Sequence, residues 1–281
     1  MKRNLLVVNK QLMDRQKEWF VHIVDPWVEA NQNKTSEKKK RYFERSYGSG
    51  SFEFAEPFFT SINECQNDDL LIMFVGQETN GWGDYQKFIS GGKNIAESQR
   101  YVREFIKNSI EKRDPQLETE YLFEYYKKKF SLYDAHAFWN FIRSVYDSAN
   151  KRINVIWTEL DKIHYKCKDR KGEDVKCITL WKEDEERLNG AFGDKKQTML
   201  EYEIEILKPD LIVFLTGPSY TKSMKSALQN DDLKKPNLDV FVQEFSVLNT
   251  ACLWTYHPNY LNRANLWDRV VDSIVDKIRS L

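Results

Sequence analysis

Several signatures of common functions are missing from this sequence. Its 281 residues include only four cysteines, Cys65, Cys167, Cys177 and Cys252, and no two of them form a CxxC pair. Such spacing fits neither a zinc site nor a disulfide framework, so we expect reduced, structural thiols and no bound metal. The sequence also contains no GxGxxG or GxxxxGK[ST] loop, which argues against the common dinucleotide and triphosphate sites.

An excess of charge of one sign is missing as well. The chain has 43 basic and 43 acidic residues, so no overall field attracts it to a polyanion, and any contact with nucleic acid must be a local patch. No apolar run reaches the length of about 18 residues that marks a membrane-spanning helix. The apolar stretch near the N-terminus is too short for a signal peptide. We therefore expect a soluble, cytoplasmic protein without a membrane partner.

The apolar residues that are present fall into short runs typical of buried strands. The clearest run, residues 70–75, lies between two aspartates and a glycine, as in a strand buried on both faces. Further strands are expected at residues 153–160, 211–215 and 238–245 and within 251–261. Helical patterning separates these runs, which predicts an α/β fold with a parallel sheet covered by helices on both sides.

The remaining segments are interpreted as additions to one domain that spans residues 1–281. Residues 1–65 are expected to form a helical extension packed on it, with a first helix that kinks or ends at Pro26 because proline lacks an amide hydrogen. Residues 161–200 are charged and lack a sustained period, which indicates an inserted loop or hairpin. The basic run at 38–41 is a candidate contact for a phosphate backbone, although a solvated face is the default interpretation.

Two polar loops follow predicted strands directly. The first is GQETN at residues 76–80, and the second is HPNYL at residues 257–261. In open α/β sheets, ligands bind outside the carboxyl ends of the strands, so the fold would bring both loops to one edge. Taken together with the strand segment KPDLIVFLTG at 208–217, they resemble the motifs of the uracil-DNA glycosylase superfamily, whose loops have the forms Gly-Gln-Asp-Pro-Tyr and His-Pro-Ser-x-Leu.

The resemblance implies a three-layer α/β/α fold with a central, mainly parallel four-stranded sheet. It implies a DNA glycosylase, active in DNA repair, that hydrolyses the N-glycosidic bond of a flipped-out uracil-like or modified base in single- or double-stranded DNA. No cofactor is implied, and we expect a monomer. The iron-sulfur branch of the superfamily needs four clustered cysteines, which this chain lacks.

The chemistry of base release assigns roles to the two loops. Breaking the bond generates positive charge on the sugar and negative charge on the departing base. The resemblance places Glu78 as the catalytic carboxylate near the sugar and His257 as the donor to the base oxyanion. Each residue also has an ordinary structural interpretation, since Glu78 could cap a following turn and His257 could bond to the backbone of its own turn.

The resemblance also implies a set of binding residues. Gln77 would position the base, and the family's base-reading asparagine is matched by Thr158 or Glu159. Further candidate substrate contacts are Asn80, Trp82 and Asn259.

For DNA, Leu261 matches the apolar wedge that fills the space of a flipped nucleotide, although a core position is an equal alternative. Tyr260 would stack on a neighbouring base, and Arg263 and Ser219 would contact phosphate.

Departures from the family pattern leave other functions open. Glu78 replaces an aspartate, and no Pro-Tyr follows it. A carboxylate at 159 only accepts hydrogen bonds, so it favours a base edge that carries an amino group, such as a cytosine derivative. A catalytically inactive relative that binds nucleic acid or a nucleotide is the main alternative, and an unrelated phosphate-binding α/β protein is a third.

Overall fold

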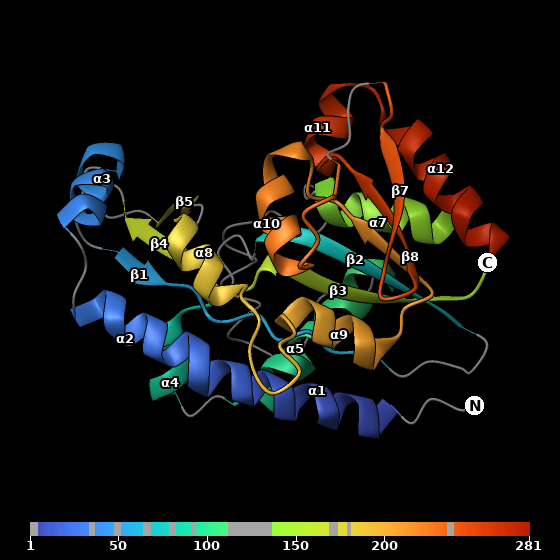
Figure 1. The fold of residues 1–281 in the computed structure, drawn as a ribbon. Coiled ribbons are helices and arrows are strands. Elements are labelled where there is room, and N and C mark those ends of the chain that lie inside the picture. Colours follow the sequence, from blue (N-terminus) through green and yellow to red (C-terminus); the bar gives the residue numbers. More distant parts are fainter. Residues whose placement is uncertain are drawn as a thin grey trace.

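Two β-sheets organise the chain (Figure 1). The computed structural model describes residues 5–33, 37–47, 52–63, 69–78, 83–91, 94–111, 137–168, 174–178, 181–234 and 239–281. The larger sheet has five strands in the order β3-β2-β6-β8-β7, and the smaller has three in the order β1-β4-β5. The strands of the larger sheet are β2 (Leu70–Glu78), β3 (Ile153–Asp161), β6 (Leu211–Phe214), β7 (Val242–Val247) and β8 (Thr250–Thr255).

The larger sheet is mixed. Strand β2 runs parallel to β3 and β6, and β6 runs parallel to β8, whereas β7 pairs with β8 in the antiparallel direction. The sequence predicted a central four-stranded, mainly parallel sheet, and the fifth strand is the antiparallel β7, which begins four residues later than the strand expected at 238–245. The predicted α/β class is confirmed, as are the approximate positions of the other four strands.

Helices cover both faces of the larger sheet, as Figure 1 shows. Side chains alternate along a strand, so Ile72 and Phe74 of β2 belong to one apolar cluster while Leu71 and Met73 belong to the other. The first cluster packs against α5 (Ile95–Glu111), α7 (Ala137–Ser148), α11 (Pro258–Arg263) and α12 (Trp267–Ser280). The second packs against α1 (Leu5–Trp19), α9 (Met199–Leu207) and α10 (Thr221–Ala227).

The N-terminal helix continues through Pro26 instead of ending there. Helix α1 passes into a π-helical turn, η1 (Phe20–Val24), and then into α2 (Asp25–Asn33). In this turn the amide of Asp25 bonds to the carbonyl of Phe20, one residue further back than in an α-helix. We attribute the continuity to this wider turn, which precedes Pro26 and its missing donor. One long helix therefore runs along both sheets, with Leu12 in the core of the larger sheet and Trp27 in the core beside the smaller one.

The smaller sheet joins two segments that lie far apart in the sequence. Strand β1 (Phe52–Phe54) belongs to the N-terminal region, whereas β4 (Tyr165–Lys168) and β5 (Asp174–Ile178) form a hairpin within 161–200. Around them lie α2, α3 (Glu37–Tyr47), α4 (Tyr85–Ser90) and α8 (Lys182–Leu188). Antiparallel pairing of β1 with β4 makes the N-terminal region and the 161–200 segment one structural unit.

A buried ion pair stabilises this unit. Lys39 of α3 donates to both carboxylate oxygens of Asp184 on α8, at 2.8 and 2.6 Å, and to the Tyr165 hydroxyl at 3.0 Å. The Trp27 indole donates to the same carboxylate at 3.0 Å. Lys39 is 6% exposed, so the basic run at 38–41 does not present all its charges to a phosphate backbone.

Burial of His164 beside the smaller sheet makes stability depend on pH. The side chain is fully buried, and desolvation, aided by Lys166, lowers its pKa to about 3 from 6.5. Between these two values the unfolded chain binds a proton that the folded chain does not. The contribution of the neutral, buried His164 to the free energy of unfolding is therefore complete above about pH 6.5. It is lost, at about 1.4 kcal/mol per pH unit, as the pH falls from there toward 3.

We expect His164→Phe to flatten the dependence of the free energy of unfolding on pH between 6.5 and 5, measured by urea denaturation. The exposed His22, changed to phenylalanine in the same way, should leave the slope as in the parent. Equal slopes for the parent and His164→Phe would contradict the burial of a neutral imidazole.

Candidate functional site

The carboxyl ends of three neighbouring parallel strands form one edge of the larger sheet. Strand β6 lies between β2 and β8, so the carboxyl ends of the three strands lie side by side. The Gln77 side chain donates to the carbonyl oxygen of Thr216 at 2.6 Å, which ties the end of β2 to the loop after β6. Gly217 of that loop, at φ 70°, donates to the carbonyl of Thr255 at 3.0 Å. The structure thus brings residues 76–78, the described part of the first predicted loop, and the turn at His257 to one edge, the rim.

His257 is held at the rim by its own turn and by α7. It is the N-cap of α11, and its Nδ1 accepts from the amide of Asn259 at 3.2 Å. Its ring stacks on Phe138, with centroids 6.5 Å apart and planes 26° apart. Because Nδ1 accepts, the proton of the neutral imidazole lies on Nε2. The bond from the backbone of its own turn, expected as the structural alternative for His257, is therefore present at Nδ1. This bond leaves Nε2 as the nitrogen that donates.

Glu159 occupies the space that a side chain at position 76 would fill. Gly76 of β2 and Glu159 of β3 are register partners. A Cβ built on Gly76 would lie 2.6 Å from the carboxyl carbon of Glu159. The Trp157 indole, two residues earlier on the same strand, donates to Oε1 of Glu159 at 2.6 Å. The glycine of the first loop is thus required by its neighbouring strand, because it makes room for this carboxylate.

We therefore expect Gly76→Ala to displace the Glu159 carboxylate and destabilise the fold by about 1–3 kcal/mol, the usual range for overpacking a core. Chemical denaturation measures this change. Gly76→Ala combined with Glu159→Ala should recover part of the loss, since the second change removes the clashing group. An unchanged midpoint for Gly76→Ala alone would show that the carboxylate does not occupy this space.

Thr158, the other predicted base reader, points to the opposite face of the sheet. It is fully buried, and its hydroxyl donates to Glu203 of α9 at 2.8 Å. Lys162 donates to that hydroxyl at 2.5 Å and to Glu203 at 2.8 Å. Of the two alternatives for the base-reading position, only Glu159 lies on the face of the sheet that carries Trp157, because adjacent residues of a strand face opposite sides.

Part of the first loop lies outside the described residues. Glu78 is the last residue of β2, in register with Asp161 of β3, and its side chain is not described. Asn80 and Trp82 fall in 79–82, outside the described ranges. The described chain resumes at Gly83, whose carbonyl accepts from Lys166 of β4 at 2.9 Å. The segment that follows the first loop is thus attached to the smaller sheet.

The predicted DNA contacts on α11 divide into buried and exposed residues. Leu261 is 0% exposed and belongs to the core, which is the alternative that the sequence left open beside the apolar wedge. Tyr260 is half-buried and stacks on Tyr256 at 4.5 Å. Arg263 is exposed and donates to the carbonyl of Asn259 at 3.2 Å. Asn259 is exposed, as is Ser219 in the loop after β6.

Phe138 and Trp157 were not predicted as site residues. Trp157 packs against Phe58, Trp139 and Phe105 at 4.5, 5.0 and 5.6 Å and lies 6.4 Å from Phe138. The rings thus form a continuous aromatic layer from the Glu159 carboxylate to His257. The sequence contained a pattern that could have identified Trp157. Trp157 and Glu159 are two positions apart in β3, so both side chains point to the same face of the sheet.

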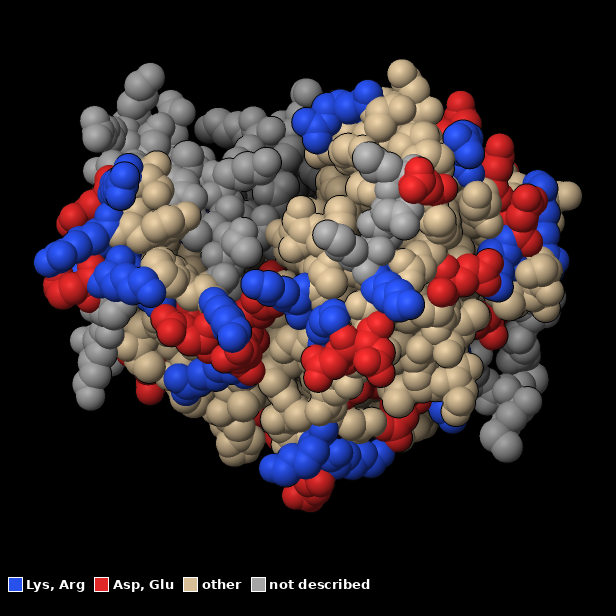
Figure 2. Space-filling model, turned by 45° about the horizontal axis from the view of Figure 1, so that its top comes forward, with Lys and Arg blue, Asp and Glu red and all other residues tan. Residues whose placement is uncertain are grey.

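The distribution of charge and the pKa values of the cysteines restrict the possible functions. On the face shown in Figure 2, basic and acidic side chains are interspersed. Burial raises the pKa of the Cys167 and Cys252 thiols to about 12, so neither is a nucleophile at neutral pH. The described residues contain no group of three or more His, Cys, Asp or Glu side chains placed to hold a metal ion.

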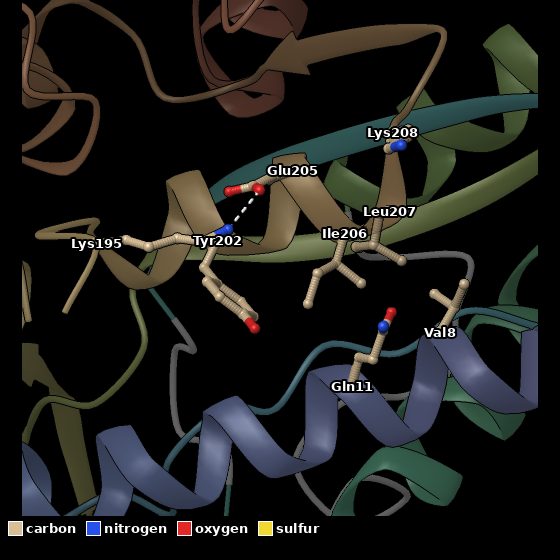
Figure 3. Close-up of a pocket in the computed structure, with 8 residues that line it drawn as sticks. All are labelled: Val8, Gln11, Lys195, Tyr202, Glu205, Ile206, Leu207 and Lys208. Carbon is tan, nitrogen blue, oxygen red and sulfur yellow. Dashed lines mark hydrogen bonds and ion pairs between the residues drawn. The ribbon is translucent and has the colours of Figure 1, made fainter. Parts of the chain in front are cut away.

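A surface cavity of about 440 Å³ lies away from the rim, between α1 and α9 (Figure 3). Its walls include Gln11, Tyr202 and Ile206, and Lys195 forms an ion pair with Glu205 at 2.7 Å. Lys208, which also lines it, precedes β6, so the cavity extends toward the amino ends of the parallel strands.

Comparisons with known proteins do not assign a family. No protein-family model and no curated protein matches the sequence of this chain. Within the described ranges, no helix combines the length and the apolar character needed to cross a lipid bilayer.

Proposed function

We propose that this protein is a DNA glycosylase of the uracil-DNA glycosylase type, which hydrolyses the N-glycosidic bond of a flipped-out base in DNA. The observation that carries the proposal is that the last three residues of β2, GQE, and the HPN turn after β8 lie at one rim, on parallel strands separated only by β6. The same rim is where open α/β sheets bind their ligands.

His257 has the geometry that the proposed reaction requires of a donor. Its Nδ1 is engaged by the Asn259 amide, so a neutral ring presents an N–H at Nε2. Donation from this nitrogen stabilises the negative charge that develops on the departing base. Stacking on Phe138 restricts the ring orientation, so the donor needs little rearrangement during the reaction.

Glu78 is proposed as the carboxylate that stabilises the positive charge on the sugar and orients the attacking water. Its backbone is fixed at the end of β2 by pairing with β3. Gln77 supports the same strand end through its bond to the carbonyl oxygen of Thr216. The proposed hydrolysis consumes only water. The fold proposed is the three-layer arrangement of that superfamily, with β7 added at one edge of its sheet.

A second candidate function is binding of nucleic acid or a nucleotide without cleavage. The observation that favours it is the burial of Leu261, which removes the expected wedge from the DNA surface. Oligonucleotide binding with no base release would distinguish this function from the first.

The test of activity is a panel of single- and double-stranded oligonucleotides that carry uracil, hypoxanthine, 5-hydroxymethyluracil or a modified cytosine. Each is incubated with the protein, treated with alkali and examined for strand breaks at abasic sites. We expect breaks at the altered base in at least one substrate. Binding without breaks in every substrate would select the second function.

A further inference from the structure

Glu159 is a buried carboxylate on β3, paired with Gly76 near the carboxyl end of β2, and its chemistry restricts the bases that the site accepts. We infer that Glu159 accepts a hydrogen bond from an exocyclic amino group, so the substrate base is of the cytosine or adenine type. This inference rests on the proposed function because it places the base at the same rim.

Two contacts fix the position of the carboxylate. Its carboxyl carbon lies 2.6 Å from the place of a Cβ on residue 76, so the glycine on β2 and the acid on β3 fit together. The Trp157 indole holds Oε1 at 2.6 Å. With 3% of the residue exposed, Glu159 is more than nine-tenths buried on the face of the sheet that also carries Trp157 and Phe74. Such a group has one orientation, as base recognition requires.

The aromatic layer connects this carboxylate to the proposed catalytic histidine. Trp157, which bonds to Glu159, lies 6.4 Å from Phe138, and Phe138 stacks on His257 at 6.5 Å. Trp157 and Phe138 both belong to the apolar cluster on the side of the sheet covered by α7. A planar base that reaches His257 is therefore on the same face as Glu159.

The carboxylate discriminates by donor and acceptor pattern. An ionised carboxylate only accepts hydrogen bonds, whereas cytosine and adenine present an amino group and uracil and thymine present a carbonyl oxygen at the equivalent edge. An amino group would bond to the Glu159 carboxylate, and a carbonyl oxygen would face acceptor oxygens without a donor. Selectivity of about 10-fold or more for amino-bearing bases follows from one such contact.

Glutamine is the informative substitution because its amide donates as well as accepts. Glu159→Gln keeps the size of the side chain and should reduce or reverse the preference for amino-bearing bases. The matched control is Glu244→Gln, on the exposed edge strand β7, where the side chain is 64% exposed. This control should keep the preference of the parent.

The measurement is the Trp157 indole N–H signal in ¹H–¹⁵N NMR spectra of the whole chain, assigned with Trp157→Phe. The probes are 1-methylcytosine, 9-methyladenine and 1-methyluracil. We expect the two amino-bearing probes to shift the signal at concentrations at least about 10-fold lower than 1-methyluracil, and Glu159→Gln to abolish this difference.

An equal or stronger response to 1-methyluracil would overturn the inference, as would no response to any probe. These outcomes are separable from failure of the proposed activity, which the oligonucleotide panel tests by itself. Release of uracil with equal probe responses would reject only the role of Glu159. A selective response to the amino-bearing probes without base release from any oligonucleotide would support the role and reject the glycosylase activity.

Discussion

Changing His257 to alanine is expected to slow base release by about 10²- to 10⁴-fold, the usual contribution of a positioned acid or hydrogen-bond donor. The Nε2 donor disappears, so negative charge on the departing base loses its partner. Single-turnover rates on the best substrate of the oligonucleotide panel measure the effect, because they report the chemical step without product release. Glu78→Gln, which keeps the size and removes the charge, should lower the same rate.

His22 provides a matched control for His257. It is an exposed histidine in the π-helical turn η1, remote in sequence from both loops, and His22→Ala should release base at the parent rate. Equal slowing by both histidine changes would point to a general loss of folded protein. Retention of the full rate by His257→Ala would remove this residue from the mechanism.

Changing Lys162 to methionine is expected to lower the free energy of unfolding by about 3–5 kcal/mol, the range for removing one partner of a buried ion pair. Lys162 is 3% exposed, and it bonds to Glu203 at 2.8 Å and to the carbonyl of Glu159 at 3.2 Å. Without it, a fully buried carboxylate remains. Burial already raises the pKa of Glu203, and Lys162 opposes this rise. Urea denaturation at neutral pH measures the loss.

The double variant Lys162→Met with Glu203→Leu tests the cause of that loss. Replacing a whole buried pair by apolar groups is often neutral or stabilising, so the double variant should be markedly more stable than Lys162→Met alone. The partly exposed pair of Lys277 and Glu244 on α12 and β7 is the control, and Lys277→Met should cost about 1 kcal/mol or less. A double variant as unstable as the single one would show that Lys162 acts through its contacts with β3.

The strands of the larger sheet and the position of the rim were predictable from the sequence. Runs such as 70–75 are continuous in apolar residues because both faces of β2 are covered, and this pattern distinguishes a buried parallel strand from an exposed one. The sequence placed GQETN and HPNYL at the ends of strands, so the meeting of residues 76–78 and His257 at one edge followed from the direction of those strands, although residues 76–78 belong to β2 itself. Sequence patterning was sufficient to predict those elements whose structure depends on residues close together in the sequence.

The smaller sheet was not predictable, because it depends on contacts distant in the sequence. Pairing of β1 with β4 joins residues more than 100 positions apart, and no local period marks it. The ion pair of Lys39 with Asp184 depends on the same contact, so a lysine in a basic run gave no sign of burial. The passage of the helix through Pro26 depends on a π-helical turn, a feature without a sequence pattern of its own.

The division of the candidate site into faces was only partly predictable. Side chains alternate between the two faces of β3, so Glu159 and Thr158 point to opposite sides. Because Trp157 and Glu159 share a face, this alternation would have selected Glu159 over Thr158 as the candidate site residue. Burial of Leu261 is a different case. Its position after His257 matches both a wedge and the first turn of α11, and only the packing of that helix against the core decides between them.

The most direct test of the proposed function is detection of the released base itself. Oligonucleotides carrying each altered base are incubated with the parent protein and with a Glu78→Gln, His257→Ala double variant purified in the same way, and free base is quantified by mass spectrometry. We predict free base in amounts equal to the abasic sites formed by the parent, and none above background with the double variant. No free base from any oligonucleotide, or equal release by the double variant, would contradict a glycosylase site at this rim.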